Sequence, residues 1–311
     1  KPLIACPTSA TGYSNRGMVI TCTVTDDGKP NNAVTTTWSW INTPSQFAWQ
    51  DETTASLWLR AKPNGTYKLR LTASDGLLSN TADVTVVLQT PPPLKLQPLG
   101  GSITEGYSGY QSYRYRLWTK LIDANAAFDF VGSSQVTNGS TPPQYPNYQG
   151  RVFDRDHEGH SGIRAPESAA ALPAWMASYS PDVSLIHLGT NDLLNIEDSE
   201  QGIKSALDGL TATVRNLRAK NPDVQLYVAQ LVPVYGGTAK LAAVSRDIQT
   251  LNSRLVAWAA GQNTARSRVR LVDMWTGYDG QLDNWDNIHP RASGEEKIAQ
   301  RWFDAIISHE F

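Results

Sequence analysis

The stretch Leu99-Gly100-Gly101-Ser102-Ile103-Thr104-Glu105-Gly106 lies between an apolar run and a segment of helical character. This position predicts that Ser102 lies where the carboxyl end of a strand turns into a helix, which is where open α/β sheets place their ligands. The flanking glycines allow a sharp turn, and the N-terminus of a helix favours negative charge. The stretch suits a nucleophile, although Gly-Gly-Ser is by itself also a common turn sequence.

Beyond this stretch, strand-like and helical segments alternate along the chain. In 200–220, for example, apolar residues recur at steps of three and four, which is typical of one face of an amphipathic helix. Such alternation predicts a three-layer α/β/α domain with a parallel, doubly wound sheet over residues 94–311. The polar segment 133–156 interrupts the pattern, and we expect a surface loop near the site. The strand candidates are 94–99, 128–131, 183–188, 224–232 and 269–274, and the helix candidates are 113–124, 165–177, 200–220, 240–260 and 293–308.

The first 88 residues follow a different pattern, in which short alternating runs are separated by turn sequences. Tyr67, Leu69 and Leu71 share one face of a predicted strand, while the residues between them are polar. Strands at this spacing, without a convincing helix, predict a small all-β sandwich for residues 1–88. The three prolines in 89–93 predict a stiff, extended linker.

The composition argues against several classes of partner and cofactor. Lys and Arg number 27 and Asp and Glu number 29, so no charge excess favours nucleic acid or an anionic membrane surface. No apolar run approaches the roughly 20 residues that span a bilayer. His and Cys do not cluster at metal-ligand spacing, so we expect neither a metal nor a cofactor. The acidic run 154–158 is compatible with calcium, but a solvated or salt-bridged loop explains it better.

Two cysteines, Cys6 and Cys22, both lie in the first predicted domain. They are either free thiols or a disulfide that holds a strand edge, and a disulfide implies an oxidising compartment. The chain starts at Lys1 without a signal peptide, which fits either a cytosolic protein or the mature form of a secreted one. We expect the disulfide, a secreted protein and a monomer.

Two further polar blocks contain candidate oxyanion donors. Gly159 lies in His157-Glu158-Gly159-His160-Ser161-Gly162, where two close glycines can expose backbone N–H groups; an ordinary flexible loop has the same composition. Asn191 follows the apolar strand candidate 183–188. Its amide can donate to an oxyanion, or it can form a turn or a helix cap.

A last block, Asp286-Asn287-Ile288-His289-Pro290, directly precedes the final predicted helix. The three-residue spacing lets the Asp286 carboxylate accept from the imidazole of His289, so that the other ring nitrogen faces a serine. Each block is a weak indication by itself. Together with Ser102 they supply a nucleophile, a base, an acid that orients the base, and oxyanion donors, all at one edge of a parallel sheet.

Three stretches of the first domain form a recognisable pattern: Thr23-Val24-Thr25-Asp26-Asp27-Gly28, Thr37-Trp38-Ser39-Trp40 and 65–76. Through them the domain resembles the polycystic-kidney-disease (PKD) type of immunoglobulin-like module, and this resemblance covers most of residues 1–88. Modules of this type commonly accompany extracellular polysaccharide-degrading enzymes. The tryptophans of this domain offer either a flat sugar-stacking platform or core packing, and we expect core packing; they are Trp38, Trp40, Trp49 and Trp58.

The second domain resembles the SGNH (GDSL-like) hydrolases, whose four blocks correspond here to Ser102, Gly159, Asn191 and His289, with Asp286 completing the triad. Within that group it is similar to carbohydrate esterase family three, whose members are largely acetyl xylan esterases. The segments that carry this similarity are 98–106, 113–118, 130–133, 156–162 and 187–192.

One position departs from the family pattern. The residue before the serine is usually Asp and is Gly101 here. Because that Asp is not a triad member, the resemblance implies that the chemistry survives. The hydrogen bonds that the Asp would make come from elsewhere or are missing.

These observations predict a secreted serine esterase that deacetylates a plant cell-wall polysaccharide, above all acetyl xylan. Ser102 attacks the ester carbonyl, His289 takes and returns the proton, and Asp286 orients His289. The backbone N–H groups of Ser102 and Gly159 and the side chain of Asn191 hold the oxyanion.

The polar segment 133–156 contributes aromatic residues spaced as sugar-contacting residues are, namely Tyr145, Tyr148 and Phe153. A lipase, a lysophospholipase or another short-chain carboxylesterase is an alternative, but a long-chain substrate needs a continuous apolar groove. A non-catalytic carbohydrate-binding or adhesion protein is the second alternative, with Gly101 as a first sign of decay.

Overall fold

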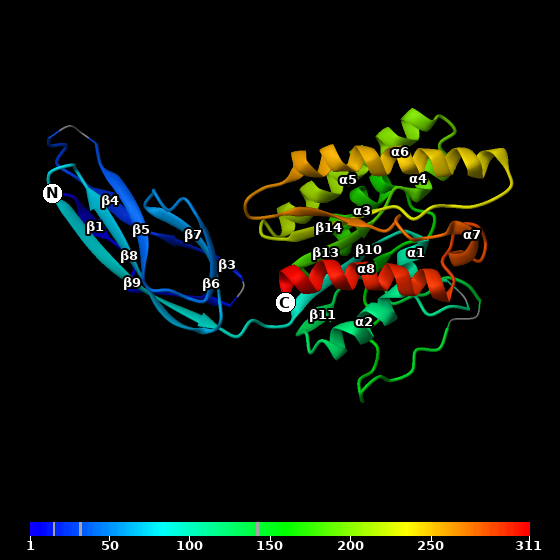
Figure 1. Cartoon of the computed structure of the whole chain (residues 1–311), viewed down its shortest axis with the longest axis horizontal. Helices are drawn as coiled ribbons and strands as arrows, with labels where there is room; N and C mark the ends of the chain where they lie inside the picture. The colour runs from blue at the N-terminus through cyan, green and yellow to red at the C-terminus, as the bar shows by residue number, and fades with distance from the viewer. Residues whose placement is uncertain (15, 31–32, 108, 141–142) are drawn as a thin grey trace. The chain divides into compact units, whose positions relative to one another are not determined.

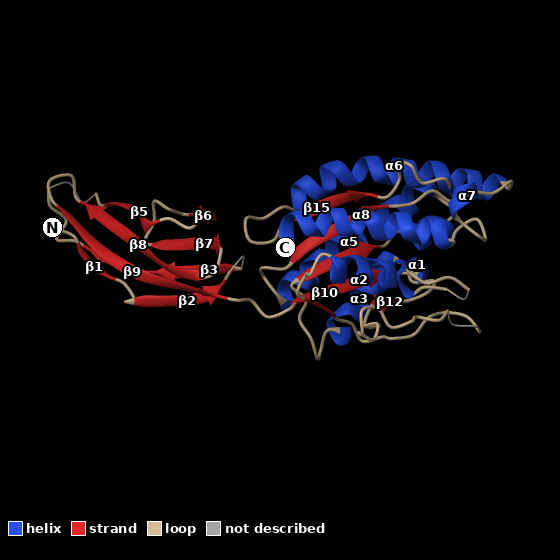
Figure 2. Cartoon of the chain, turned by 60° about the horizontal axis from the view of Figure 1, so that its bottom comes forward, coloured by secondary structure: helices blue, strands red, loops and turns tan. Residues whose placement is uncertain are grey.

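The chain divides into two compact units, Lys1–Pro92 and Pro93–Phe311 (Figure 1). The division falls within the proline run of the predicted linker 89–93. Among the described residues, all helices lie in the second unit (Figure 2), and none of them is long and apolar enough to cross a membrane. The computed structural model describes every residue except 15, 31–32, 108 and 141–142.

The first unit is all-β, and two of its sheets share one apolar core. In β8 (Gly65–Ser74), Leu69 and Leu71 are fully buried, whereas Lys68 and Arg70 are exposed. The alternation therefore has the period of two that was predicted for a half-buried strand. The larger sheet has the order β2 (Ser9–Tyr13), β9 (Ser79–Gln89), β8 and β5 (Thr35–Asn42), and the smaller one β3 (Gly17–Thr21), β7 (Ser56–Lys62) and β6 (Gln46–Gln50). The strands β1 (Leu3–Ala5) and β4 (Thr23–Thr25) pair separately.

The tryptophans of the first unit mostly pack in its core, as expected. Trp38 is 2% exposed, and its Nε1 donates to the Thr54 carbonyl at 2.9 Å. The rings of Trp40 and Trp49 stack with centroids 6.0 Å apart and pack against the same core. Trp58 differs, because it alternates with the buried leucines of β7 and is only partly buried. A resemblance to PKD-type modules stays a prediction.

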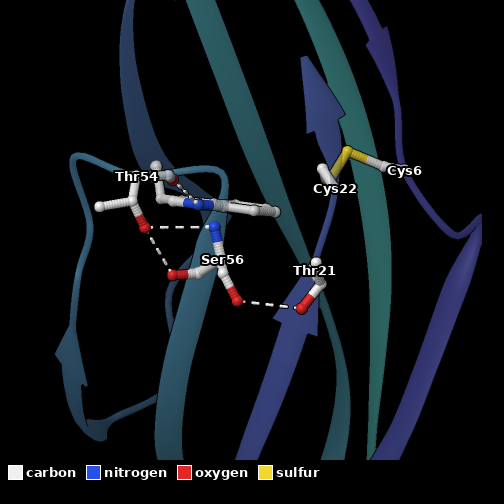
Figure 3. Close-up of a disulfide and its surroundings, with 6 residues drawn as sticks. Cys6, Thr21, Cys22, Thr54 and Ser56 are labelled. Atoms are coloured by element: carbon white, nitrogen blue, oxygen red, sulfur yellow. Dashed lines mark hydrogen bonds between the residues drawn. A yellow bond between two sulfur atoms is a disulfide. The ribbon is translucent and has the colours of Figure 1, made fainter.

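Cys6 and Cys22 form a disulfide with a sequence separation of 16. Figure 3 shows this bond beside a small polar network, in which the Thr21 and Ser56 hydroxyls lie 2.9 Å apart. Cys22 is 6% exposed and belongs to the core of the unit. The bond therefore ties the N-terminal segment to the core.

Replacing both cysteines by alanine should lower the free energy of unfolding of the first unit by about 3 kcal/mol, because the cross-link no longer restricts the unfolded chain. Hydrogen exchange of the core strands β7 and β8, read by mass spectrometry, measures this loss. The second unit serves as the internal control. Unchanged protection of β7 and β8 would show that the disulfide does not stabilise the unit.

The second unit is built on a parallel sheet, as predicted from the alternation of its segments. Its first strand in the sequence, β10 (Leu94–Gly100), pairs with β11 (Phe128–Phe130) on one side and with β13 (Val183–His187) on the other. The order of the strands therefore runs outward from β10 to both sides. In open parallel sheets, the ligand site lies at the carboxyl ends of the strands where this order reverses. Ser102 lies two residues beyond that end of β10. The remaining strands are β12 (Glu158–Gly159), β14 (Gln225–Gln230) and β15 (Val269–Asp273).

Helices cover both faces of this sheet, so the three layers agree with the prediction. Successive strand residues point to opposite faces, and Leu185 accordingly joins the core beneath α2 and α8, while Ile186 joins the core beneath α3, α5 and α6. The helices are α1 (Ser102–Glu105), α2 (Tyr113–Asp123), α3 (Ala165–Trp175), α4 (Thr190–Asn195), α5 (Ser199–Lys220), α6 (Ala239–Gln262), α7 (Gly280–Asp283) and α8 (Ala292–Glu310).

Candidate active site

Ser102 occupies the first position of α1, directly after the turn that ends β10. The turn is crowded: a Cβ at Gly100 would lie 2.2 Å from Thr104 Oγ1 and 2.7 Å from the His187 carbonyl oxygen. Only glycine fits there, so the chain can turn from strand to helix within two residues. The backbone N–H of Ser102 lies at the N-terminus of this helix, where N–H groups have no partner within the helix.

A buried arginine holds the other end of α1. Arg114 of α2 is 1% exposed, and its guanidinium donates to the carbonyls of Thr104 at 2.8 Å and Glu105 at 3.0 Å. It also donates to the Arg155 carbonyl at 3.0 Å. A helix this short leaves its last carbonyls without partners in the helix, and Arg114 supplies the missing hydrogen-bond donors. The position of Ser102 is thus fixed from both ends of α1.

The structure brings Ser102, His289 and Asp286 together. His289 Nε2 lies 2.8 Å from Ser102 Oγ, and His289 Nδ1 lies 2.6 Å from Asp286 Oδ2. The backbone N–H groups of Ile288 and His289 donate to Asp286 Oδ1 at 3.1 and 2.7 Å. Because Nδ1–H donates to the carboxylate, Nε2 is left to accept the proton of the Ser102 hydroxyl.

The charge state of Asp286 suits this role. Partial burial acts to raise the pKa of Asp286, but the hydrogen bonds from the ring and backbone of His289 outweigh it, and the pKa lies below its usual value. The carboxylate therefore stays ionised and stabilises a positive charge on the imidazole.

Asn191 lies in the first turn of α4 and lines the same cavity as Ser102. Its Nδ2 donates to the Ile163 carbonyl at 3.0 Å, and a Cβ built at Gly101 would lie 3.0 Å from that nitrogen. A carboxamide nitrogen carries two hydrogens. One holds the side chain in place, and the other is available to an oxyanion beside Ser102.

Gly159 does not have the predicted role. Its N–H donates to His157 Nδ1 at 2.9 Å, the residue is buried, and a Cβ there would lie 2.2 Å from the Glu105 backbone nitrogen. Gly159 belongs to β12, whose pairing with β10 turns this N–H away from the cavity. His157 accepts at Nδ1 because burial, aided by the charge of Arg114, lowers its pKa to about 2 and keeps the ring neutral. Gly159 allows close packing of β12 on α1.

Gly162 is the glycine of this block that lines the cavity. It has a φ of +78°, and its Cα faces open space. The sequence offered a signal, since the block contains two glycines. The sequence could not show which of the two glycines would be part of the short strand β12.

The three aromatic residues predicted to contact a sugar do not line the cavity. Phe153 is 4% exposed and belongs to the core beneath α2, and Tyr145 packs on it with ring centroids 4.8 Å apart. The Tyr148 hydroxyl donates to Asp123 at 2.8 Å. The prediction was wrong because the described part of segment 133–156 packs its aromatic side chains inward against α2.

Two aromatic residues that the sequence reasoning missed lie at the site. Tyr107 lines the cavity, and its ring lies 5.3 Å from the His289 ring. Trp285 lies 5.1 Å from Tyr107, measured between ring centroids. The only sequence signal for Trp285 is its position directly before Asp286.

The cavity beside Ser102 has a volume of about 200 Å³. Gly162, Asn191 and His289 line it together with Ser102, so the cavity can hold an ester carbonyl between a nucleophile and hydrogen-bond donors. Apolar side chains form another part of the lining and can take an acyl group; they are Ile103, Ile163, Leu188, Leu194 and Ile288.

Gly101 begins α1 without a side-chain hydrogen bond to the helix. An Asp at this position would cap α1, and its Cβ would lie beside Asn191 Nδ2. The described structure gives α1 no substitute for that cap. The carbonyl bonds from Arg114 hold the other end of the helix.

Residues 99–297 match the GDSL-like Lipase/Acylhydrolase family. The chain belongs to this family. The match includes Ser102, Asn191, Asp286 and His289, and it makes the second unit a carboxylic ester hydrolase domain.

Other esterases are similar to this chain. The multidomain esterase of Ruminococcus flavefaciens is 27% identical over 235 residues, which is 68% of this chain but 28% of that protein. A carbohydrate esterase family 3 structure from Talaromyces cellulolyticus is 29% identical with a TM-score of 0.58, and the match covers 69% of this chain and 97% of that one. A mutant acetyl esterase crystallised with an acetate ion gives the same identity, TM-score and coverage.

Changing Asp286→Asn in the GDSL-like domain should lower kcat on an aryl acetate about ten-thousand-fold, because an amide favours the wrong tautomer of His289. Steady-state kinetics measures the loss. Asp208→Asn on α5 is a matched control, since that carboxylate is exposed and pairs only with Lys204 in the described interactions. A loss of less than about tenfold would show that Asp286 does not orient the base.

Changing Asn191→Ala should lower kcat by about a hundred- to a thousandfold with little change in KM, because an oxyanion donor acts mainly in the transition state. Asn195→Ala, at the exposed last residue of α4, is the control and should keep full activity. If the two variants behave alike, Asn191 does not stabilise the oxyanion.

Proposed function

We propose that this chain is a secreted serine esterase that removes acetyl groups from a plant cell-wall polysaccharide, with acetyl xylan as the first candidate. The observation that carries the proposal is the continuous line of hydrogen bonds from Asp286 through His289 to Ser102, which ends at the cavity. In a carboxylic ester hydrolase domain, this line activates a serine hydroxyl as a nucleophile.

The first half of the reaction transfers the acetyl group to the enzyme. Ser102 Oγ bonds to the ester carbonyl carbon while its proton passes to His289 Nε2. The negative charge on the carbonyl oxygen is met by Asn191 Nδ2 and by the backbone N–H groups of Ser102 and Gly162. The tetrahedral intermediate collapses, and the sugar oxygen leaves with the proton from His289.

The second half releases acetate by the same steps. A water molecule gives its proton to His289 Nε2 and attacks the acetyl carbon, and Ser102 Oγ leaves with that proton. The Asp286 carboxylate stabilises the imidazolium in both halves. Acetate and the free hydroxyl of Ser102 result.

Two observations support the acetyl and extracellular parts of the proposal. The similar structures include a carbohydrate esterase of family 3 and an acetyl esterase with acetate. The disulfide between Cys6 and Cys22 suits an oxidising compartment such as the cell exterior. We infer a monomeric enzyme that uses no cofactor.

The proposal predicts that the chain releases acetate from acetylated xylan and that Ser102→Ala lowers this rate at least about a million-fold, to the background of the assay. Ser253→Ala, on the exposed part of α6, is the matched control. Equal acetate release by the Ser102→Ala variant would contradict the proposed mechanism.

Acyl length separates the proposal from a lipase. Acetyl and octanoyl esters of one chromophore should differ by at least about tenfold in kcat/KM in favour of acetyl, because a longer chain needs a continuous apolar groove. A preference for the octanoyl ester would favour the lipase instead.

A further inference from the structure

An aromatic surface beside His289 is not used by the proposed mechanism. The rings of Tyr107 and His289 lie 5.3 Å apart at 21°, and those of Tyr107 and Trp285 lie 5.1 Å apart at 33°. Trp285 and His289 are 6.2 Å apart at 25°. The three rings therefore lie beside one another with small angles between their planes. One of them is the imidazole that bonds to Ser102 Oγ.

Trp285 is unusual in its exposure. It is 38% exposed, which makes it the most exposed of the ten tryptophans, all of which lie in the described part of the chain. A large aromatic side chain gains free energy by burial. Its exposure next to a cavity therefore indicates a surface that a bound molecule covers.

The backbone around Trp285 is fixed by the segment that positions the base. The Trp285 N–H donates to the His289 carbonyl at 2.9 Å. The preceding residue, Asn284, is 2% exposed, and its side chain donates to the carbonyls of Pro233 and Asn287 at 3.2 Å. These hydrogen bonds therefore couple the backbone of Trp285 to that of His289. A group bound on the Trp285 ring would be held at a fixed position relative to the ester at Ser102.

We infer that Tyr107 and Trp285 form a sugar-binding platform, which holds the pyranose ring that carries the ester and makes the site prefer acetylated sugars over simple acetates. The inference rests on the proposed function. A pyranose ring has an apolar face of C–H groups, which packs on an aromatic ring, and a rim of hydroxyls. With its acetyl carbonyl at Ser102, the sugar is separated from the reacting carbon by one ester oxygen and lies within reach of Tyr107.

Two polar residues of the cavity suit the hydroxyl rim of such a ring. Asn138, whose backbone pairs with that of Tyr107, and Ser161 both line the cavity, and Asn138 Nδ2 donates to Ser161 Oγ at 2.6 Å. Ser161 is in turn held by Glu105, whose Oε2 accepts from the Ser161 N–H at 2.7 Å. An aromatic ring beside fixed hydroxyl and amide groups fits a sugar better than a fatty acyl chain.

The test compares an acetylated xylo-oligosaccharide with ethyl acetate, which has no ring to pack on the platform. For Trp285→Leu, the ratio of kcat/KM on the oligosaccharide to kcat/KM on ethyl acetate should fall at least about tenfold, mainly through KM. Trp285→Phe keeps an aromatic face and should keep the ratio within about threefold. Trp258 lies near the C-terminal end of α6 and is partly buried. Trp258→Leu controls for the loss of a tryptophan elsewhere in the chain and should leave the ratio unchanged.

A binding measurement provides a readout besides activity. In the Ser102→Ala background, Trp285→Leu should weaken binding of the acetylated oligosaccharide at least about tenfold in calorimetry, because the packing on the aromatic face is lost. Trp285→Phe should bind as the parent does.

The outcomes separate the two proposals. If the unchanged chain cleaves both esters and Trp285→Leu leaves both the ratio and the binding as they were, the platform is overturned and the esterase proposal stands. If the unchanged chain cleaves ethyl acetate but not the oligosaccharide, the sugar substrate and the platform are both overturned. If it cleaves neither ester, the acetyl esterase proposal fails, and the platform fails with it.

Discussion

The hydrogen bond between Ser102 Oγ and His289 Nε2 joins α1 to the loop before α8, across 187 residues of the sequence. Its length depends on how tightly these two segments are held. On one side, the close packing around Gly100 and the carbonyl bonds from Arg114 fix α1. On the other side, two backbone N–H groups fix the carboxylate of Asp286. A serine hydroxyl is a weak nucleophile without this alignment, so the chemistry of the site depends on backbone packing.

Much of the architecture could be predicted from the sequence because periodicity and topology are local and regular properties. Alternating strand-like and helical runs imply a parallel sheet, and in such a sheet the segments that follow the strands meet at one edge. That rule places Ser102, Asn191 and the pair Asp286 and His289 at this edge, since each lies in a segment that follows a strand of the sheet. In the structure Ser102, Asn191 and His289 line one cavity, and Asp286 bonds to His289.

The irregular segments could not be predicted in the same way. Whether Gly159 or Gly162 faces the cavity depends on the pairing of the two-residue strand β12 with β10, which no periodic pattern encodes. Tyr145, Tyr148 and Phe153 lie in a polar segment, yet Phe153 is buried and Tyr145 packs on it, because loops also bury aromatic side chains where a helix offers an apolar surface. Tyr107 and Trp285 are 178 positions apart in the sequence, and only the fold brings their rings together.

The central claim is that Ser102 carries the acyl group during turnover. Rapid acid quenching of the chain with an activated aryl acetate, followed by peptide mass mapping, tests it most directly. We predict the mass of one acetyl group on the peptide that contains Ser102, and a larger labelled fraction in Asp286→Asn if deacylation is slowed more than acylation. Release of acetate without any acetyl group on that peptide, or with the acetyl group on another residue, would contradict a role of Ser102 as the nucleophile.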